Sequence, residues 1–309
     1  MTEHGLANEG LPLVSIGMSV LNCASTLGMA LQSILQQTHP NWELWLLDDG
    51  STDETVDVAS QFHDPRIHLI ADGKNLGLAA RLNQATGLAQ GQYFARMDGD
   101  DVCYPERFER QVTMLESRPE IDLLGCGAIV FSGNGQAIGR LPVRIEHAEI
   151  CARPWAGFYL AHPTWMGRVE WFRHFPYRQS AKRAQDQDLL LRTYHHCCFA
   201  ALPDTLLGYR QEKVSLSRVL RGRYHFSRAL LRQLIDGADW RLLRGLVEQP
   251  VKSVVDVLAV ASGLNYRLLR HRAMPIDDKM RAAWDEVWST YAESLSSDHT
   301  RLVINTRED

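Results

Sequence analysis

The sequence predicts an α/β fold, in which a Rossmann-like, mainly parallel sheet carries helices on both faces and is followed by a C-terminal helical extension. Short apolar runs alternate with helical patterns through the first hundred of the 309 residues. Such alternation requires right-handed crossovers between parallel strands. From about residue 216 onward the chain has only helical patterns.

The elements follow one another in a regular order. Apolar runs predict strands at 11–20, 42–49, 66–71 and 92–98. The patterns between these runs predict helices at 27–37, 52–62 and 76–90. A further helix is expected at 105–118, and after it two strands within 121–141 are joined by a Gly-Asn-Gly turn.

Composition excludes several classes of protein. No apolar run approaches the ~20 residues that span a bilayer, and the first ten residues lack the basic and apolar stretches of a secretion signal. We therefore expect a cytoplasmic protein. The six cysteines form no C-x-x-C pair, which argues against a zinc ribbon and against a disulfide framework.

Charge is distributed unevenly along the chain. Residues 213–281 contain 14 Lys or Arg and six Asp or Glu, whereas the whole chain has a formal net charge of −4. A basic segment beside an acidic body favours contact with an anion, either a diphosphate or an acidic membrane surface. A solvated helical face explains the same pattern equally well. We expect no nucleic-acid partner.

Acidic residues stand where two of the predicted strands end: Asp48 and Asp49 after the second strand, and Asp98, Asp100 and Asp101 after the fourth. Carboxyl ends of parallel strands share one edge of a sheet, so these carboxylates repel one another unless a cation compensates. Mg²⁺ or Mn²⁺ suits such oxygen ligands. Gly99 is expected to let the backbone approach a diphosphate closely. The alternative is an acidic surface turn in which Asp101 caps a short helix.

Several segments in a fixed order resemble the family 2 glycosyltransferases with the GT-A fold. The resemblance runs from Val14 to about Ser217 and is carried by VSIGMSVLN, SILQQTHPNWELWLLDDGSTDET, NLGLAARLNQATGLAQGQYFARMDGDDVCYPERFERQV, HPTWMGR, AQDQDLLLR and LPDTLLGYRQEKVSLS. It implies an inverting enzyme that moves a sugar from a nucleoside-diphosphate sugar to a hydroxyl. We accordingly divide the chain into an unstructured N-terminus (1–10), a GT-A domain (11–215) with a nucleotide-sugar half (11–118) and an acceptor half (119–215), and a C-terminal helical region (216–309).

The resemblance places the donor site in the first half. It implies that Asp49 accepts a hydrogen bond from the nucleotide base, with Ser19 nearby at the end of the first strand. Asp98 would contact the ribose or the donor sugar and serve as a weaker metal ligand. Asp100 would bind the Mg²⁺ or Mn²⁺ that bridges the two phosphates and stabilises the departing diphosphate. Arg81 is a further donor-site candidate, and its alternative is a guanidinium on a helix surface.

The acceptor half contains the candidate base. The family places this base in an acidic pair at the start of a helix, typically Glu-Asp followed one residue later by Asp. Here the stretch begins Gln185-Asp186, so Asp186 matches the base while Gln185 departs from Glu, and Asp188 is a weaker candidate. Alternatively, both acids stand there because a helix N-terminus favours them. His162 either lines the donor or acceptor site or is a buried, hydrogen-bonded histidine.

The resemblance also implies a biological setting. We expect a bacterial enzyme that uses a UDP-sugar to elongate a glycan or lipid-linked oligosaccharide for surface polysaccharide, with its basic helices in peripheral contact with the inner face of the plasma membrane. Two other classes stay open. One is a noncatalytic nucleotide-binding subunit with the same fold. The other is a nicotinamide-dependent oxidoreductase, suggested by Gly125-Cys126-Gly127, which lacks the third glycine of G-x-G-x-x-G.

Overall fold

The computed structural model describes residues 10–211, 215–237, 239–262 and 274–305. The expectation of an unstructured N-terminus at 1–10 therefore lies outside the described residues, apart from Gly10. Nine strands are seen in the described part of the chain: β1 (Val14–Val20), β2 (Trp42–Asp48), β3 (Ile67–Ala71), β4 (Tyr93–Asp98), β5 (Val102–Cys103), β6 (Leu123–Phe131), β7 (Ala137–Arg140), β8 (Met166–Arg168) and β9 (Phe199–Arg210).

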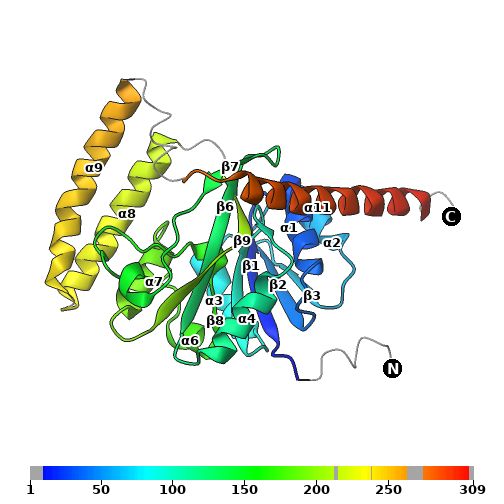
Figure 1. Ribbon diagram of the computed structural model, residues 1–309, viewed down its shortest axis with the longest axis horizontal. Coiled ribbons are helices and arrows are strands. Elements are labelled where there is room, and N and C mark those ends of the chain that lie inside the picture. The colour runs from blue at the N-terminus through cyan, green and yellow to red at the C-terminus, as the bar shows by residue number, and fades with distance from the viewer. Residues whose placement is uncertain (1–9, 212–214, 238, 263–273, 306–309) are drawn as a thin grey trace.

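All nine strands form one sheet in the order β3-β2-β1-β4-β8-β6-β9-β5, with β7 paired to β6 (Figure 1). The first four strands are parallel, as predicted. The rest of the sheet is mixed, because β8 is antiparallel to both β4 and β6, whereas β9 is parallel to β6. The expectation of a mainly parallel sheet thus holds for the nucleotide half only.

Helices cover both faces of the sheet, as expected for an α/β fold (Figure 1). The apolar side chains of α1 (Ala24–Leu35), α2 (Thr55–Ser60) and α4 (Arg107–Ser117) belong to one core cluster with β1, β2 and β4. Those of α3 (Leu78–Leu88), α6 (Val169–His174) and α7 (Gln185–Thr193) belong to a second cluster on the other face. A short helix, α5 (His147–Ile150), lies beside β9.

The crossovers bring the carboxyl ends of β1, β2 and β4 to one edge. In the sheet register Ser19 lies beside Asp98, and Val20 lies beside Asp48. The loops that follow β1 and β2 are bonded to each other: the side chain of Asn22 accepts a hydrogen bond from the N–H of Thr52 at 2.8 Å. Asn22 has a positive φ of 51°, which asparagine tolerates better than most residues. This hydrogen bond therefore holds the two loops together at this edge of the sheet.

The predicted C-terminal helical region separates into two parts. The helices α8 (Leu216–Ile235) and α9 (Leu243–Ala261) form a hairpin beside α7, whereas α11 (Asp278–Asn305) lies on the other side of the molecule against α1 and β7 (Figure 1). Trp284 anchors α11: its ring is fully buried, and its Nε1–H donates to the carbonyl of Gly135 at 2.7 Å. None of the described helices is both long enough and apolar enough to cross a bilayer.

Candidate active site

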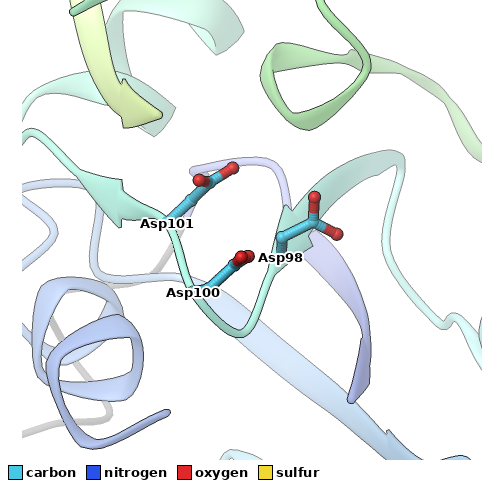
Figure 2. Close-up of side chains that lie close together, drawn as sticks. All are labelled: Asp98, Asp100 and Asp101. Carbon is cyan, nitrogen blue, oxygen red and sulfur yellow. The ribbon is translucent and has the colours of Figure 1, made fainter. Parts of the chain in front are cut away.

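Three carboxylates meet on the turn between β4 and β5. Asp98 ends β4, and Asp100 and Asp101 follow it on the turn (Figure 2). Each of the three offers an oxygen, and all of these oxygens lie within 4.8 Å of one another. Asp101 is buried; one of its oxygens accepts the N–H of Arg210 at 2.8 Å, and the other, Oδ2, has no hydrogen-bond partner among the described residues.

These carboxylates destabilise one another. Protein atoms surround Asp100 on the side away from solvent, and this desolvation, followed by the charge of Asp98, raises the pKa of Asp100 to about 6. Burial, followed by the charges of Asp98 and Asp100, raises the pKa of Asp101 well above its ordinary value. Three oxygen ligands, mutual repulsion and one unpaired buried oxygen fit a hard divalent cation such as Mg²⁺ or Mn²⁺.

One interpretation of this turn is wrong, and the approach of Gly99 to a diphosphate stays a prediction. Asp101 caps no helix, since α4 begins six residues later at Arg107; it is instead a third candidate metal ligand. The signal was present in the sequence as the second acid of Asp100-Asp101. Gly99 is required by packing inside the protein, because a Cβ there would lie 2.7 Å from Val20 Cγ1. Close approach to a diphosphate is therefore not needed to explain this glycine.

Asp49 lies just past the carboxyl end of β2 and is almost fully buried. Its Oδ1 accepts hydrogen bonds from the N–H groups of Leu76 at 2.7 Å and Gly77 at 3.0 Å, and from Nε of Arg81 at 3.1 Å. Its Oδ2 accepts only the N–H of Gly77 and retains a lone pair. Asp49 thus fixes the start of α3, and its contact with a nucleotide base stays a prediction. Ser19, which is partly exposed, lies beside Asp98 in the neighbouring strand, close to this site.

The side chain of Arg81 donates a hydrogen bond to Asp49. The interpretation of Arg81 as a helix-surface guanidinium is wrong, since the side chain is fully buried. Besides its bond to Asp49, it donates to both oxygens of Asp72, to the side chain of Gln84 and to the carbonyl of Lys74. These bonds occupy all five of its N–H donors. The hydrogen bond from Arg81 also lowers the pKa of Asp72 to about 2.

Arg96 is a candidate site residue that the sequence analysis missed. It lies on β4 two residues before Asp98, is 3% exposed, and forms an ion pair with Asp98. Its Nε and Nη1 are buried without a hydrogen-bond partner among the described residues. Its positive charge lowers the pKa values of Asp100 and Asp186, although burial of these carboxyls dominates and raises both. An unsatisfied guanidinium is costly to bury, so its position between two acidic sites indicates a role in the site.

A cavity of about 690 Å³ lies next to this edge of the sheet, and its walls come from the acceptor half and from the α8–α9 hairpin. Asp186, in the first turn of α7, lines the cavity, and burial raises the pKa of its carboxyl. A raised pKa makes a carboxylate a stronger base. Among the described residues, Asp186 is the carboxylate that lines the cavity, and its role as the base stays a prediction.

His162 lines the same cavity and is also buried and hydrogen-bonded, so both interpretations of this residue apply. Its Nε2 lies 2.9 Å from the hydroxyl of Tyr177, and its ring packs edge-on against Trp165. Burial, followed by the charge of Arg96, lowers the pKa of His162 well below its ordinary value. The imidazole is therefore neutral at physiological pH and does not provide a charged group.

Asp188 does not line the cavity. Its carboxylate is completely buried and forms ion pairs with Arg192 at 3.1 Å and Arg178 at 3.7 Å. The structure thus gives Asp188 a positioning role in α7, and its candidacy as a catalytic group is withdrawn because an acceptor in the cavity would not reach it.

Arg210 joins the acidic turn to the cavity. It lines the cavity, its N–H donates to Asp101, and its Nε donates to the carbonyl of Asp100 at 2.9 Å. The guanidinium also lies over the ring of Phe131, 4.7 Å from its centre. Burial, followed by the charges of this acidic turn, raises the pKa of the neighbouring Tyr209 to about 12. Arg210 therefore connects the turn that carries the predicted cation site to the wall of the cavity that contains the predicted base.

This fold and site define a class of protein, an α/β protein with a cluster of three carboxylates at its strand ends and a cavity beside it. Residues 15–175 match the model of glycosyl transferase family 2. Because this match covers more than half of the chain, the chain belongs to that family and is a glycosyltransferase. The oxidoreductase alternative is wrong, since Gly125 and Gly127 lie inside β6 and not on a strand-to-helix turn.

Named relatives and a solved structure agree with this assignment. The chain is 38% identical over 193 residues to the putative glycosyltransferase EpsE of Bacillus subtilis, with 60% of this chain and 68% of EpsE covered. It is 37% identical over 103 residues to WfgD of Escherichia coli, a UDP-Glc:alpha-D-GlcNAc-diphosphoundecaprenol beta-1,3-glucosyltransferase, with 33% and 41% covered. The mannosyltransferase PcManGT of Pyrobaculum calidifontis, solved with GDP-Man and Mn²⁺, superposes with a TM-score of 0.59 at 17% identity, with 94% of this chain and 86% of PcManGT covered, and supports the GT-A fold.

Proposed function

We propose that this glycosyltransferase transfers one sugar, with inversion, from a UDP-sugar to a hydroxyl of a lipid-linked oligosaccharide in bacterial surface-polysaccharide synthesis, at the inner face of the plasma membrane. The observation that carries the proposal is the position of Arg210, which contacts the acidic turn and lines the cavity that contains Asp186. The printed name of WfgD, with a UDP-sugar donor and a diphospholipid acceptor, supports this choice of substrates.

The carboxylates of the acidic turn and Asp186 have separate tasks in the reaction. Asp100 and Asp101, with Asp98, would hold Mg²⁺ or Mn²⁺, which neutralises the charge that develops on the departing nucleoside diphosphate. Asp186 accepts the proton of the acceptor hydroxyl while the oxygen of that hydroxyl forms a bond to C1 of the donor sugar. The bond between C1 and the phosphate oxygen breaks in the same step, and the nucleoside diphosphate leaves with the electron pair. Closure of the cavity by α8 would keep water from competing for C1.

The cavity fits an acceptor that carries phosphate. Four arginines line it, and two of them, Arg183 and Arg218, have no carboxylate partner among the described residues. Arg183 adopts a positive φ of 59°, a conformation that arginine rarely takes, and stands just before α7. Guanidinium groups recognise phosphate oxygens in bidentate pairs. We assign these two arginines to the diphosphate of the acceptor.

The proposed function is tested by mass-spectrometric assay of sugar transfer. UDP-, GDP- and dTDP-sugars would be combined with a GlcNAc-diphospholipid and with an alkyl glycoside of the same sugar, in the presence of Mn²⁺. We expect transfer from a UDP-sugar, with a higher kcat/KM for the diphospholipid. A noncatalytic subunit would bind nucleotide without forming product in any combination.

Charge-removing variants test the acceptor assignment. Arg183→Gln and Arg218→Gln should each lower kcat/KM for the diphospholipid by about tenfold, as expected for a charge-assisted hydrogen bond worth about 1.5 kcal/mol, and leave the alkyl glycoside unaffected. The control is Arg173→Gln, since Arg173 is half-exposed on α6 and pairs with Glu170. An equal loss with both acceptors would contradict a phosphate contact.

A further inference from the structure

The helix α9 exposes an apolar stripe. Residues spaced three or four apart lie on one helix face, and five of them in α9 are large, apolar and more than half exposed. These residues, called here the outer stripe, are Leu243, Val247, Val251, Val254 and Leu258. Two further valines, Val255 and Val257, flank it and are also exposed. Monomeric proteins rarely leave so continuous an apolar surface in water.

The opposite face of α9 packs on the rest of the protein and buries no large apolar side chain completely, although Leu246 is partly buried against the core. Its buried residues are Gly245, Gln249 and Asp256. Arg223 of α8 pairs with Asp256 at 2.7 Å and donates to Gln249 at 3.2 Å. The helix is therefore inverted relative to an ordinary surface helix, in which the apolar face is turned inward. Because burial of each Å² of apolar surface is worth about 25 cal/mol, this arrangement favours a second apolar surface that covers the outer stripe.

The chain connecting the two helices adds aromatic and aliphatic side chains. Trp240 is 77% exposed, and Ile235, at the end of α8, is 75% exposed. Leu231, about one turn earlier on α8, and Tyr224, about three turns earlier, are also exposed. Tryptophan and tyrosine side chains partition to the boundary between water and lipid, where the ring is apolar and its polar group remains hydrated.

The charge of the α8–α9 hairpin indicates which kind of surface covers the outer stripe. The sequence from 216 to 262 contains eight Lys or Arg and four Asp or Glu. The four acids all pair with basic residues, whereas three arginines of α8 that do not line the cavity have no carboxylate partner among the described residues: Arg221, Arg228 and Arg232. Two copies of so basic a hairpin would repel each other. An anionic bilayer attracts it by about 1 kcal/mol per basic residue near the surface.

We propose that the α8–α9 hairpin is a membrane-docking surface, which inserts the outer stripe and Trp240 into the interfacial layer of an anionic bilayer. Since α9 does not qualify as a membrane span, it lies along the surface as an interfacial helix. The inner side of the same hairpin lines the cavity with Arg218, Arg223 and Gln249. On the basis of the proposed function, docking brings the cavity to the membrane that contains the lipid-linked acceptor.

The test is flotation of the full chain with vesicles of phosphatidylcholine containing 30% phosphatidylglycerol (about one lipid in three), compared with pure phosphatidylcholine. A double variant, Val247→Glu with Val254→Glu, places two charges on the outer stripe. A matched control, Ile138→Glu, changes a half-exposed residue of β7 outside the hairpin. We expect the wild type and the control to float with the anionic vesicles and the double variant to lose at least tenfold in apparent affinity, with melting temperatures unchanged.

The readouts separate this inference from the proposed function. If the double variant still floats, or if the wild type does not, membrane docking is overturned. A wild type that dimerises in sedimentation through the outer stripe without binding vesicles would also overturn it. Transfer to a water-soluble alkyl glycoside should be equal in the wild type and the double variant. Absence of transfer in both would refute the proposed function while leaving vesicle binding to decide the docking surface.

Discussion

At the scale of single residues, the candidate site contains carboxylates whose like charges repel one another in the absence of a bound cation. Asp98, Asp100 and Asp101 repel one another on a tight turn, and Arg96 supplies the nearest buried positive charge. The sequence motif was enough to find Asp98 and Asp100. It could not show Arg96 and Arg210 in the site, because their roles depend on contacts that only the fold creates, such as the bond between Arg210 and Asp101 across 109 positions.

Replacement of Asp100 should stabilise the metal-free protein at neutral pH. The folded-state pKa of Asp100, about 6, lies above the ordinary value of 3.8, so the folded state binds the proton more tightly. The wild type therefore loses stability as pH rises from about 4 to about 6. Asp100→Asn avoids this loss. After allowance for solvent screening, we expect a melting temperature roughly 2 °C higher at pH 8, no gain below pH 4, and no response to Mn²⁺. An equal Mn²⁺ response in both proteins would refute the assignment of Asp100.

Removal of the positive charge of Arg96 should move the pH profile of catalysis. This charge lowers the pKa of Asp186, so Arg96→Gln should raise that pKa. The acid limb of the plot of kcat/KM against pH should then shift to higher pH. Arg96→Lys, which keeps the charge, should leave the limb in place. The limb is measured from initial rates between pH 5 and 8. If the two variants give the same profile, the charge of Arg96 does not act on the base.

At the scale of secondary-structure elements, sequence patterns predicted the nucleotide half well. The strands β1 to β4 and helices α1 to α4 have long apolar runs and regular periodicity, which depend little on the rest of the fold. The acceptor half was less predictable. Its strand β8 is three residues long, and β5, at the end of the nucleotide half, is only two residues long; tertiary contacts determine the place of both in the sheet. The division of the C-terminal helices between two sides of the molecule has no local sequence signal.

The anchor of α11 offers a test at this scale. Trp284 lies against Gly208, where an added Cβ would stand 2.3 Å from the indole ring, so glycine makes room for the tryptophan. Trp284→Ala should lower the free energy of unfolding by about 3–5 kcal/mol, because it leaves a cavity in a fully buried site. Trp240→Ala is the matched control and should cost less than about 0.5 kcal/mol, since Trp240 is exposed. Urea unfolding measures both, and similar losses would show that α11 is not held through Trp284.

At the scale of the whole molecule, one sheet joins two candidate sites that Arg210 connects. The parallel half provides the acidic turn at its strand ends, and the mixed half provides the cavity wall with Asp186. The α8–α9 hairpin closes the cavity on its inner side and exposes the outer stripe on its other side. The sequence showed the basic composition of this region, but only the structure shows that its apolar residues point outward.

The central claim is that the acidic turn binds the donor through a cation while Asp186 acts only on the acceptor. Calorimetric titration of UDP with Mn²⁺, with GDP and dTDP as parallel ligands, tests it most directly in the wild type, Asp100→Asn and Asp186→Asn. We expect Asp186→Asn to bind the nucleotide as the wild type does while turnover falls by about 10²–10⁴-fold, and Asp100→Asn to lose the Mn²⁺-dependent part of binding. Loss of nucleotide binding in Asp186→Asn, with Mn²⁺-dependent binding intact in Asp100→Asn, would contradict the account.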